Sequence, residues 1–326
     1  MTHRIRSGRL SLAVLPLALL SALPVAAQDT ETEAPALADT APVAAPDVTF
    51  DTARGEVSMP PAPETIAVFD IAAADTLDAL GVEIAGTIDR VFVDYLAEMA
   101  EDAEVVGTIF EPDMEALNAM QPDLVVIGGR SAEQLDAVSG IAPTIDMTIP
   151  GEDMVDVAMD RIEAYGTLFE RQAEAAALIG EFETRLAGVR ETAADEGTAL
   201  IVLTNGPKIS AYGPGSRFGW IHDALDLAPA VEDVDTATHG EAISFEFIRD
   251  ANPDWLIVID RAAAIGQEGA RAEETLNNEL VAGTTAWEQG QVVYLNAADA
   301  YIAGGGIRSM TRTLDTLAQG FADAEQ

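Results

Sequence analysis

A pattern of sixteen residues occurs twice in this sequence and constrains its fold more than any other feature. It reads EALNAMQPDLVVIGGR over residues 115–130 and EFIRDANPDWLIVIDR over residues 246–261. Each copy has a Glu seven residues before a Pro-Asp pair and an Arg eight residues after that proline. The apolar run after Pro-Asp is typical of a buried strand, and the residues before it favour a short helix. The repeat therefore predicts two lobes of similar βα architecture with a pocket between them.

Short apolar segments alternate with helical segments on both sides of the chain's middle. Strands are expected near residues 66–69, 82–87, 104–106, 124–127, 199–204, 209–212, 255–259 and 291–295. Helices are expected near residues 70–80, 95–100, 113–120, 132–139, 220–225, 245–251 and 309–322. Strands that are apolar throughout favour mainly parallel sheets covered on both faces. The predicted fold class is therefore α/β.

Residues 150–194 contain no expected strand and have apolar residues at helical spacing, with interruptions near Gly166 and Gly180. Their position between the two copies predicts a connecting helix that packs across the back of both lobes. The predicted division is a signal peptide at 1–27, a disordered leader and edge strand or hairpin at 28–62, an N-terminal lobe at 63–149, the connecting helix at 150–194 and a C-terminal lobe at 195–326.

The N-terminus has the pattern of a secretory signal peptide. Three arginines precede a mostly apolar run over residues 10–20, and small residues at 25–27 suit cleavage after about Ala27. No Cys follows the apolar run, so no lipid anchor is expected. The mature protein is expected to be exported and soluble.

Charge and cysteine content exclude several classes of function. The chain has 56 acidic and 17 basic residues, a formal charge of -39, whereas nucleic-acid binding needs a basic surface. The absence of Cys excludes disulfides, zinc-thiolate sites, iron–sulfur clusters and thiol nucleophiles. The sequence has no G-x-S-x-G elbow, no P-loop lysine and no H-E-x-x-H pair, so no catalytic residue is predicted. A carboxylate-based secreted α/β enzyme, such as a nucleotide-sugar transferase, stays an alternative.

Three arginines are candidates for binding an anionic ligand. Arg130 and Arg261 each follow an expected strand, and ligands of open α/β sheets bind outside the carboxyl ends of strands. Arg217 lies in a glycine-rich loop after another expected strand. Guanidinium groups recognise anions through charge-assisted, forked hydrogen bonds. The alternative is that each arginine simply pairs with a nearby Asp or Glu.

Four further residues carry weaker hypotheses. Tyr301 and His239 have side chains that suit ferric iron, although a solvated histidine and a packed tyrosine ring are the commoner roles. Glu115 and Glu246 occupy equal places in the two copies. They are either solvated helix-surface acids or carboxylates at the lobe tips that dock on basic sites of a partner.

Five stretches of this chain resemble a known family. They are VFDIAAADTLDALGV (68–82), GTIFEPDMEALNAMQPDLVVIGGRSAEQLDAVSGIAPTIDMT (107–148), GPGSRFGWIHDALDL (213–227), HGEAISFEFIRDANPDWLIVIDR (239–261) and YIAGGG (301–306). The family comprises the helical-backbone periplasmic substrate-binding proteins of ABC importers that take up ferric siderophores. The chain is most similar to their enterobactin/petrobactin (catecholate-type) branch.

The resemblance implies two Rossmann-like lobes joined by one long backbone helix, with a ligand cleft between them. It implies that Arg130, Arg217 and Arg261 bind the ferric catecholate, and that His239 and Tyr301 complete the iron shell when the siderophore supplies only four donor atoms. It further implies that one Glu of each lobe, Glu115 and Glu246 by position in the motif, forms salt bridges with the permease.

The function expected from this resemblance is that of a periplasmic, monomeric receptor. It would carry a ferric siderophore to an inner-membrane ABC permease and hold no intrinsic cofactor. A haem or cobalamin receptor of the same class stays an alternative. The chain departs from many relatives in its acidity and its lack of a lipid-anchor signal.

Overall fold

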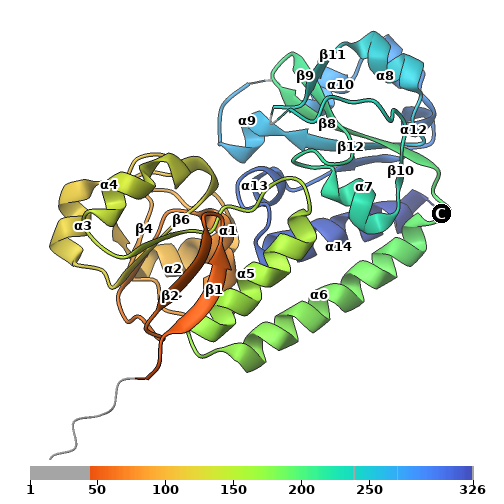
Figure 1. Cartoon of the computed structure of the whole chain (residues 1–326). Coiled ribbons are helices and arrows are strands. Elements are labelled where there is room, and N and C mark those ends of the chain that lie inside the picture. Colours follow the sequence, from red (N-terminus) through yellow and green to blue (C-terminus); the bar gives the residue numbers. More distant parts are fainter. Residues whose placement is uncertain (1–44, 238, 270, 325–326) are drawn as a thin grey trace, which may run out of the picture. The chain divides into compact units, whose positions relative to one another are not determined.

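The computed structural model describes residues 45–237, 239–269 and 271–324 (Figure 1). The predicted signal peptide and the leader up to residue 44 lie outside the described residues. Within those residues, no helix combines the length and the apolar composition needed to cross a bilayer. The chain from Val48 to Met59 forms the expected hairpin, with β1 (Val48–Thr52) antiparallel to β2 (Gly55–Met59).

The first sheet is entirely parallel, with strand order β5-β4-β3-β6-β7. Its strands are β3 (Ile66–Val68), β4 (Gly86–Thr87), β5 (Glu104–Val105), β6 (Leu124–Ile127) and β7 (Thr144–Asp146). Its helices are α1 (Ile71–Ala79), η1 (Asp94–Leu96), α2 (Ala97–Asp102), α3 (Met114–Met120), η2 (Gly129–Gln134) and α4 (Leu135–Ser139). The strand expected at 82–87 is therefore confined to its last two residues.

The second sheet is mixed, with order β11-β9-β8-β12-β13 and β10 paired to β8. Its strands are β8 (Thr198–Asn205), β9 (Lys208–Tyr212), β10 (Ala228–Pro229), β11 (Glu241–Ile243), β12 (Trp255–Asp260) and β13 (Val292–Tyr294). The pairs among β8, β10, β12 and β13 are parallel, whereas β9 and β11 are antiparallel to their neighbours. Its helices are α7 (Trp220–Leu225), α8 (Phe245–Ala251), α9 (Arg261–Ala264), α10 (Ala272–Leu276), α11 (Glu279–Ala282), α12 (Thr285–Glu288), α13 (Ala297–Tyr301) and α14 (Ile307–Ala324).

Both faces of the second sheet are covered, as the continuous apolar strands predict. Successive residues of a strand point to opposite faces. In β12, Ile257 and Ile259 belong to the large core shared with the first sheet, while Leu256 and Val258 belong to a second core on the other face. The predicted α/β class is confirmed.

The two copies of the sequence repeat build the same local unit. Helices α3 and α8 both have seven residues, and the side chains of Asp113 and Ser244 cap their N-termini. Each helix is closed by a residue in the left-handed conformation, which turns the chain toward the following Pro-Asp. The aspartates of those pairs then play equal roles. Asp123 accepts the backbone N–H of Thr65 at 2.8 Å beside β3, and Asp254 accepts that of Thr198 at 2.8 Å at the start of β8.

The connecting region contains two helices, α5 (Met154–Leu168) and α6 (Gln172–Ala193), of which α6 is the long one. The interruption expected near Gly166 falls at residues 169–171, between α5 and α6, whereas the one expected near Gly180 is wrong because Gly180 lies inside α6. A Cβ at Gly166 would lie 2.6 Å from the Cβ of Ala175, so this glycine lets α5 and α6 pack closely instead of ending a helix. Helix α6 also packs against α7 and α14 (Figure 1).

A buried carboxylate joins α1, beside the first sheet, to α14, beside the second. Asp75 of α1 accepts the backbone N–H groups of Arg308 and Ser309, each at 2.9 Å, and the hydroxyl of Tyr95 at 2.7 Å. The N–H groups in the first turn of a helix lack partners within the helix, so Asp75 acts as a cap supplied from another element. Arg308 also pairs with Asp78 of α1.

We predict that the Asp75 junction makes stability depend on pH. Burial raises the pKa of Asp75 from 3.8 to about 6, although its three hydrogen bonds act in the opposite direction. Because the folded-state pKa is the higher one, the contribution of Asp75 is fully present below pH ~4 and is lost as pH rises through ~6. A shift of this size corresponds to about 3 kcal/mol. Asp75→Asn, which resembles the protonated carboxyl, should not show this loss.

Urea unfolding of both proteins at pH 4.5 and 7.5 checks this. The free energy of unfolding of wild type minus that of Asp75→Asn should fall by about 2–3 kcal/mol between the two pH values. An equal difference at both would show that Asp75 does not titrate in this window.

Candidate functional site

Segments from both sheets bring the three predicted arginines to one tyrosine. Arg130 lies in η2, which follows β6 of the parallel sheet, and Arg261 is the first residue of α9, directly after β12. Arg217 lies in the loop between β9 and α7. Tyr301 is the last residue of α13, which follows β13. The strand ends position Arg130 and Arg261 at equivalent places in the two copies of the repeat.

The side chains of all three arginines contact Tyr301. Arg130 Nη2 donates to the backbone carbonyl of Tyr301 at 2.7 Å, and an Nη of Arg217 donates to the same carbonyl. Arg261 Nε donates to the Tyr301 hydroxyl at 3.1 Å. The guanidinium carbons lie 5.2, 4.5 and 5.7 Å from the centre of the tyrosine ring for Arg130, Arg217 and Arg261, a range in which cation–π attraction operates. We call these four residues the Tyr301 cluster.

The Tyr301 cluster holds three cations that have no carboxylate partner. Among the described residues, neither Arg130, Arg217 nor Arg261 has a carboxylate oxygen within 4.0 Å, whereas six other arginines each pair with an aspartate. The alternative that each of these arginines simply pairs with a nearby Asp or Glu is therefore wrong for the described residues. Their hydrogen-bond acceptors are neutral oxygens, which an anionic ligand can replace with stronger, charge-assisted bonds.

The electrostatics of the cluster favour bound anions. Burial lowers the pKa of the Arg217 guanidinium, and the neighbouring charge of Arg130 lowers it further. Burial alone would raise the pKa of Tyr301. The hydrogen bond from Arg261 and the charges of the three arginines outweigh it, so the pKa of Tyr301 lies below its ordinary value of 10.0. The phenolate of Tyr301 is thus easier to form here than in water, which suits a hard cation such as Fe³⁺.

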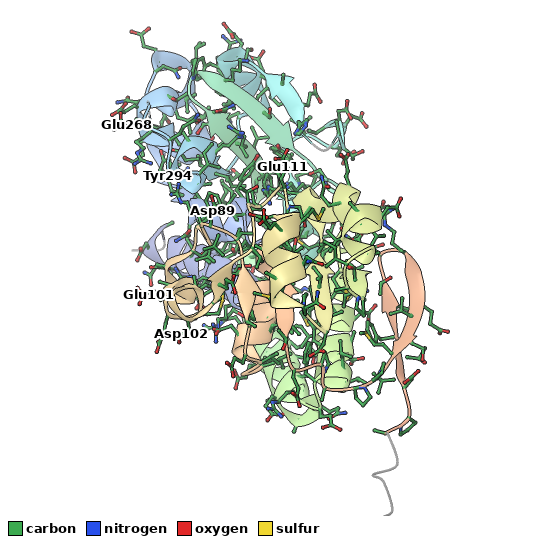
Figure 2. The ribbon with its side chains drawn as sticks, turned by 90° about the vertical axis from the view of Figure 1, so that its left-hand side faces the viewer. Asp89, Glu101, Asp102, Glu111, Glu268 and Tyr294 are labelled. Atoms are coloured by element: carbon green, nitrogen blue, oxygen red, sulfur yellow. The ribbon has the colours of Figure 1, made fainter. Side chains whose placement is uncertain are left out.

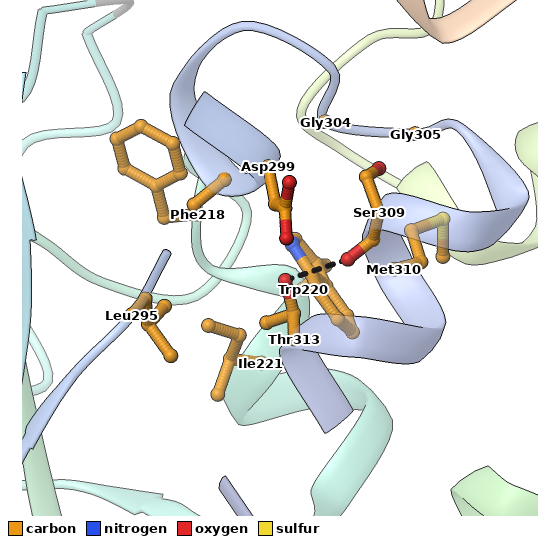
Figure 3. Close-up of a pocket in the computed structure, with 11 residues that line it drawn as sticks. Phe218, Trp220, Ile221, Leu295, Asp299, Gly304, Gly305, Ser309, Met310 and Thr313 are labelled. Carbon is orange, nitrogen blue, oxygen red and sulfur yellow. Dashed lines mark hydrogen bonds between the residues drawn. The ribbon is translucent and has the colours of Figure 1, made fainter. Parts of the chain in front are cut away.

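Helix α13, which ends at Tyr301, is joined to α14 by a partly buried ion pair. Asp299 Oδ2 accepts Arg312 Nε of α14 at 2.6 Å. Asp299 Oδ1 is buried and has no hydrogen-bond partner among the residues that the structure describes. Asp299 lines a cavity of about 10 Å³ together with Ser309, Thr313 and Trp220 (Figure 3). Such a cavity has room for about one water molecule, so it is not a site for a larger ligand.

His239 and the two glutamates lie outside the Tyr301 cluster. His239 is exposed in the loop between β10 and β11, and no hydrogen bond joins it to the cluster. Glu115 and Glu246 are exposed in the first turns of α3 and α8. Hydrogen bonds from its own backbone N–H and from Ser244 lower the pKa of Glu246. Within the described part of the chain, no group of three or more His, Asp or Glu side chains could hold a metal ion.

A fourth arginine that the sequence analysis missed lies at the same edge of the first sheet. Arg90 follows β4, as Arg130 follows β6, and its Nη1 donates to the backbone carbonyl of Ile265 at 3.1 Å. Ile265 is the residue that closes α9, the helix that begins with Arg261. The available signal was an Arg three residues after an expected strand. Arg90 was not singled out because it lies outside the two copies of the repeat, which pointed to Arg130 and Arg261.

Comparisons with known proteins show the family to which this chain belongs. The family model described as periplasmic binding protein matches residues 66–298. The chain is 32% identical over 272 residues to the petrobactin-binding protein YclQ of Bacillus subtilis, covering 82% of this chain and 85% of that protein. It is 31% identical over 266 residues to the ferric-anguibactin-binding protein FatB of Vibrio anguillarum, covering 79% and 83%.

Solved structures give the same result. The crystal structure of YclQ matches with a TM-score of 0.80 and covers 84% of this chain and 98% of that chain. The periplasmic catecholate-siderophore binding protein VctP of Vibrio cholerae is 27% identical, with a TM-score of 0.78 and coverage of 83% and 99%. The family resemblance inferred from the five stretches is thereby confirmed. This chain belongs to the periplasmic binding protein family.

Proposed function

We propose that this protein is a periplasmic receptor that binds a ferric catecholate siderophore and delivers it to an inner-membrane ABC permease. The observation that carries this proposal is the convergence of Arg130, Arg217 and Arg261 on Tyr301 without a carboxylate partner. Three free guanidinium groups match the charge of a trianionic ferric complex. The relatives are named for petrobactin, ferric anguibactin and catecholate siderophores, which supports this ligand class.

The proposed role also covers chemistry, oligomeric state and the position of the ligand site. The protein performs no chemistry on its ligand and needs no intrinsic cofactor, because the iron arrives with the siderophore. It acts as a monomer after export and removal of residues 1–27. The ligand site lies between a lobe at 63–149 and a lobe at 195–326.

The proposal predicts tight and selective binding of ferric catecholates. Trp220, Trp255 and Trp287 all lie in or beside the second sheet, so an iron chromophore held at the Tyr301 cluster should quench tryptophan fluorescence. We would titrate the mature protein with ferric bis- and tris-catecholates, haemin and cobalamin. Quenching by the ferric catecholates alone is expected. Quenching by haemin or cobalamin alone would show that the ligand is not a ferric catecholate. Quenching by none of them would contradict the proposal.

Variants locate the binding in the same experiment. Arg130→Ala, Arg217→Ala and Arg261→Ala should each weaken ferric catecholate binding by about tenfold to a hundredfold, because each removes a charged hydrogen-bond donor. Arg171→Ala is the matched control, since Arg171 is exposed, donates only to a backbone carbonyl and lies between α5 and α6. Unchanged affinity in all three cluster variants would place the ligand elsewhere.

We further propose that Tyr301 and His239 ligate the iron when a siderophore supplies only four donor atoms. The lowered pKa of Tyr301 supports phenolate ligation. His239 is exposed, so its imidazole is accessible to a bound complex. The ferric bis-catecholate complex of Tyr301→Phe should lack the phenolate-to-iron charge-transfer band of the wild type, while the ferric tris-catecholate spectrum should stay the same. A bis-catecholate band unchanged by the substitution would exclude ligation by Tyr301.

The permease is proposed to recognise Glu115 and Glu246, one on each copy of the repeat. Both side chains are exposed at the first turn of equivalent helices and have no ion-pair partner among the described residues. Glu115→Lys and Glu246→Lys should therefore reduce siderophore uptake by cells, since they place a cation against a basic surface. Ligand affinity of the purified protein should not change. Normal uptake by the double variant would argue against this docking surface.

A further inference from the structure

Arg90 lies on the same sheet edge as Arg130 and reaches across to the other sheet's helix α9. In the parallel first sheet β4 and β6 flank β3, so the residues that follow these strands emerge at one edge. Arg90 Nη1 donates to the carbonyl of Ile265 at 3.1 Å, a contact between residues 175 positions apart. One turn of α9, about 6 Å along its axis, separates Ile265 from Arg261 of the Tyr301 cluster.

Two residues, Gly266 and Phe92, lie next to the guanidinium group of Arg90. Gly266 has a φ of +65°, and a Cβ at this position would lie 2.4 Å from Arg90 Nη2. A side chain at residue 266 would therefore require the flexible end of Arg90 to shift. On the other side, the ring of Phe92 lies 4.8 Å from the guanidinium carbon, and Phe92 has a φ of +65°, which is costly for a bulky residue. Of the two residues, only Phe92 adopts a backbone conformation that is unusual for its residue type, because glycine adopts positive φ readily.

Among the described residues, Arg90 has no carboxylate partner, although two acidic residues lie near this contact in the sequence. Asp89 precedes it in the sequence, and Glu268 follows the Ile265 contact by three residues (Figure 2). Both are exposed, yet among the described residues no carboxylate oxygen lies within 4.0 Å of Arg90. Arg90 thus shares the condition of the three cluster arginines, with a neutral carbonyl as acceptor and an aromatic ring beside the cation.

We propose that Arg90 is a specificity-determining residue that binds a carboxylate of the ligand outside the iron-donor atoms. This inference rests on the proposed function. A ligand held at the Tyr301 cluster extends along α9 to Arg90, which exchanges the Ile265 carbonyl for the carboxylate. The planar, forked guanidinium matches a carboxylate, and the charged pair is about twice as strong as a hydrogen bond to a neutral acceptor. With ferric catecholates that lack such a carboxylate, Arg90 keeps its hydrogen bond to the Ile265 carbonyl.

Two synthetic ligands separate this role from a general effect on the site. They are ferric bis-catecholates that are identical except for one carboxylate on the linker between the catechol rings. Wild-type protein should bind the carboxylated ligand more tightly. Arg90→Ala should weaken binding of the carboxylated ligand by about tenfold and binding of the other ligand by less than about twofold. Arg90→Lys should retain part of the preference, because it keeps the charge but not the fork.

Arg171→Ala is the control, since it removes the same charge from an exposed position and should affect both ligands equally and slightly. Thermal unfolding of each variant checks that the fold is intact. An equal loss for both ligands in Arg90→Ala would show that Arg90 only holds α9 in place, and no loss would show that it is not in contact with ligand. Either result overturns the inference but leaves the proposed function standing. Failure of wild type to bind either ligand would overturn both.

Discussion

Three guanidinium groups held around one tyrosine without a carboxylate set the main physical constraint on this protein. Burial and the neighbouring charge of Arg130 both lower the pKa of Arg217, so holding these cations together carries an electrostatic cost. The Tyr301 carbonyl, the Tyr301 hydroxyl and the face of the tyrosine ring hold the charges in place. A local aspartate would stabilise the cluster further but would occupy the positions that an anionic ligand needs. The fold therefore tolerates repulsion between these cations at the position where an anionic ligand would bind.

Such a cluster requires a frame that fixes elements from the two sheets relative to one tyrosine. The buried Asp75 carboxylate joins α1 to the first turn of α14. The Asp299–Arg312 pair then joins α14 to α13, which ends at Tyr301. The first sheet is thus connected to the tyrosine through two buried carboxylates and one helix. Asp75 accepts backbone N–H groups, whereas Asp299 pairs with a charged side chain, so only the first behaves as a helix cap.

The sequence predicts the arginines of the Tyr301 cluster better than it predicts the tyrosine on which they meet. The repeat locates Arg130 and Arg261 because both depend on local order, a strand followed by an arginine. It cannot show that both arginines meet Tyr301, since that contact joins residues 171 and 40 positions apart. The antiparallel course of β9 and β11 is likewise set by pairing partners and not by apolar spacing. Arg90 was missed because it belongs to neither copy of the repeat, and its contact with Ile265 joins residues 175 positions apart.

The duplication also explains why Arg130 and Arg261 occupy equivalent positions, whereas Tyr301 between them has no equivalent. Each copy contributes a helix, a Pro-Asp pair, a strand and an arginine, so Arg130 and Arg261 approach from equivalent positions. Tyr301 belongs to no repeated segment, and the two arginines bind different parts of it, the carbonyl and the hydroxyl. The formal charge of -39 acts against an approaching anion, but salt screens it beyond about 10 Å. At contact distance the three unpaired cations dominate, so an acidic protein can still bind an anion.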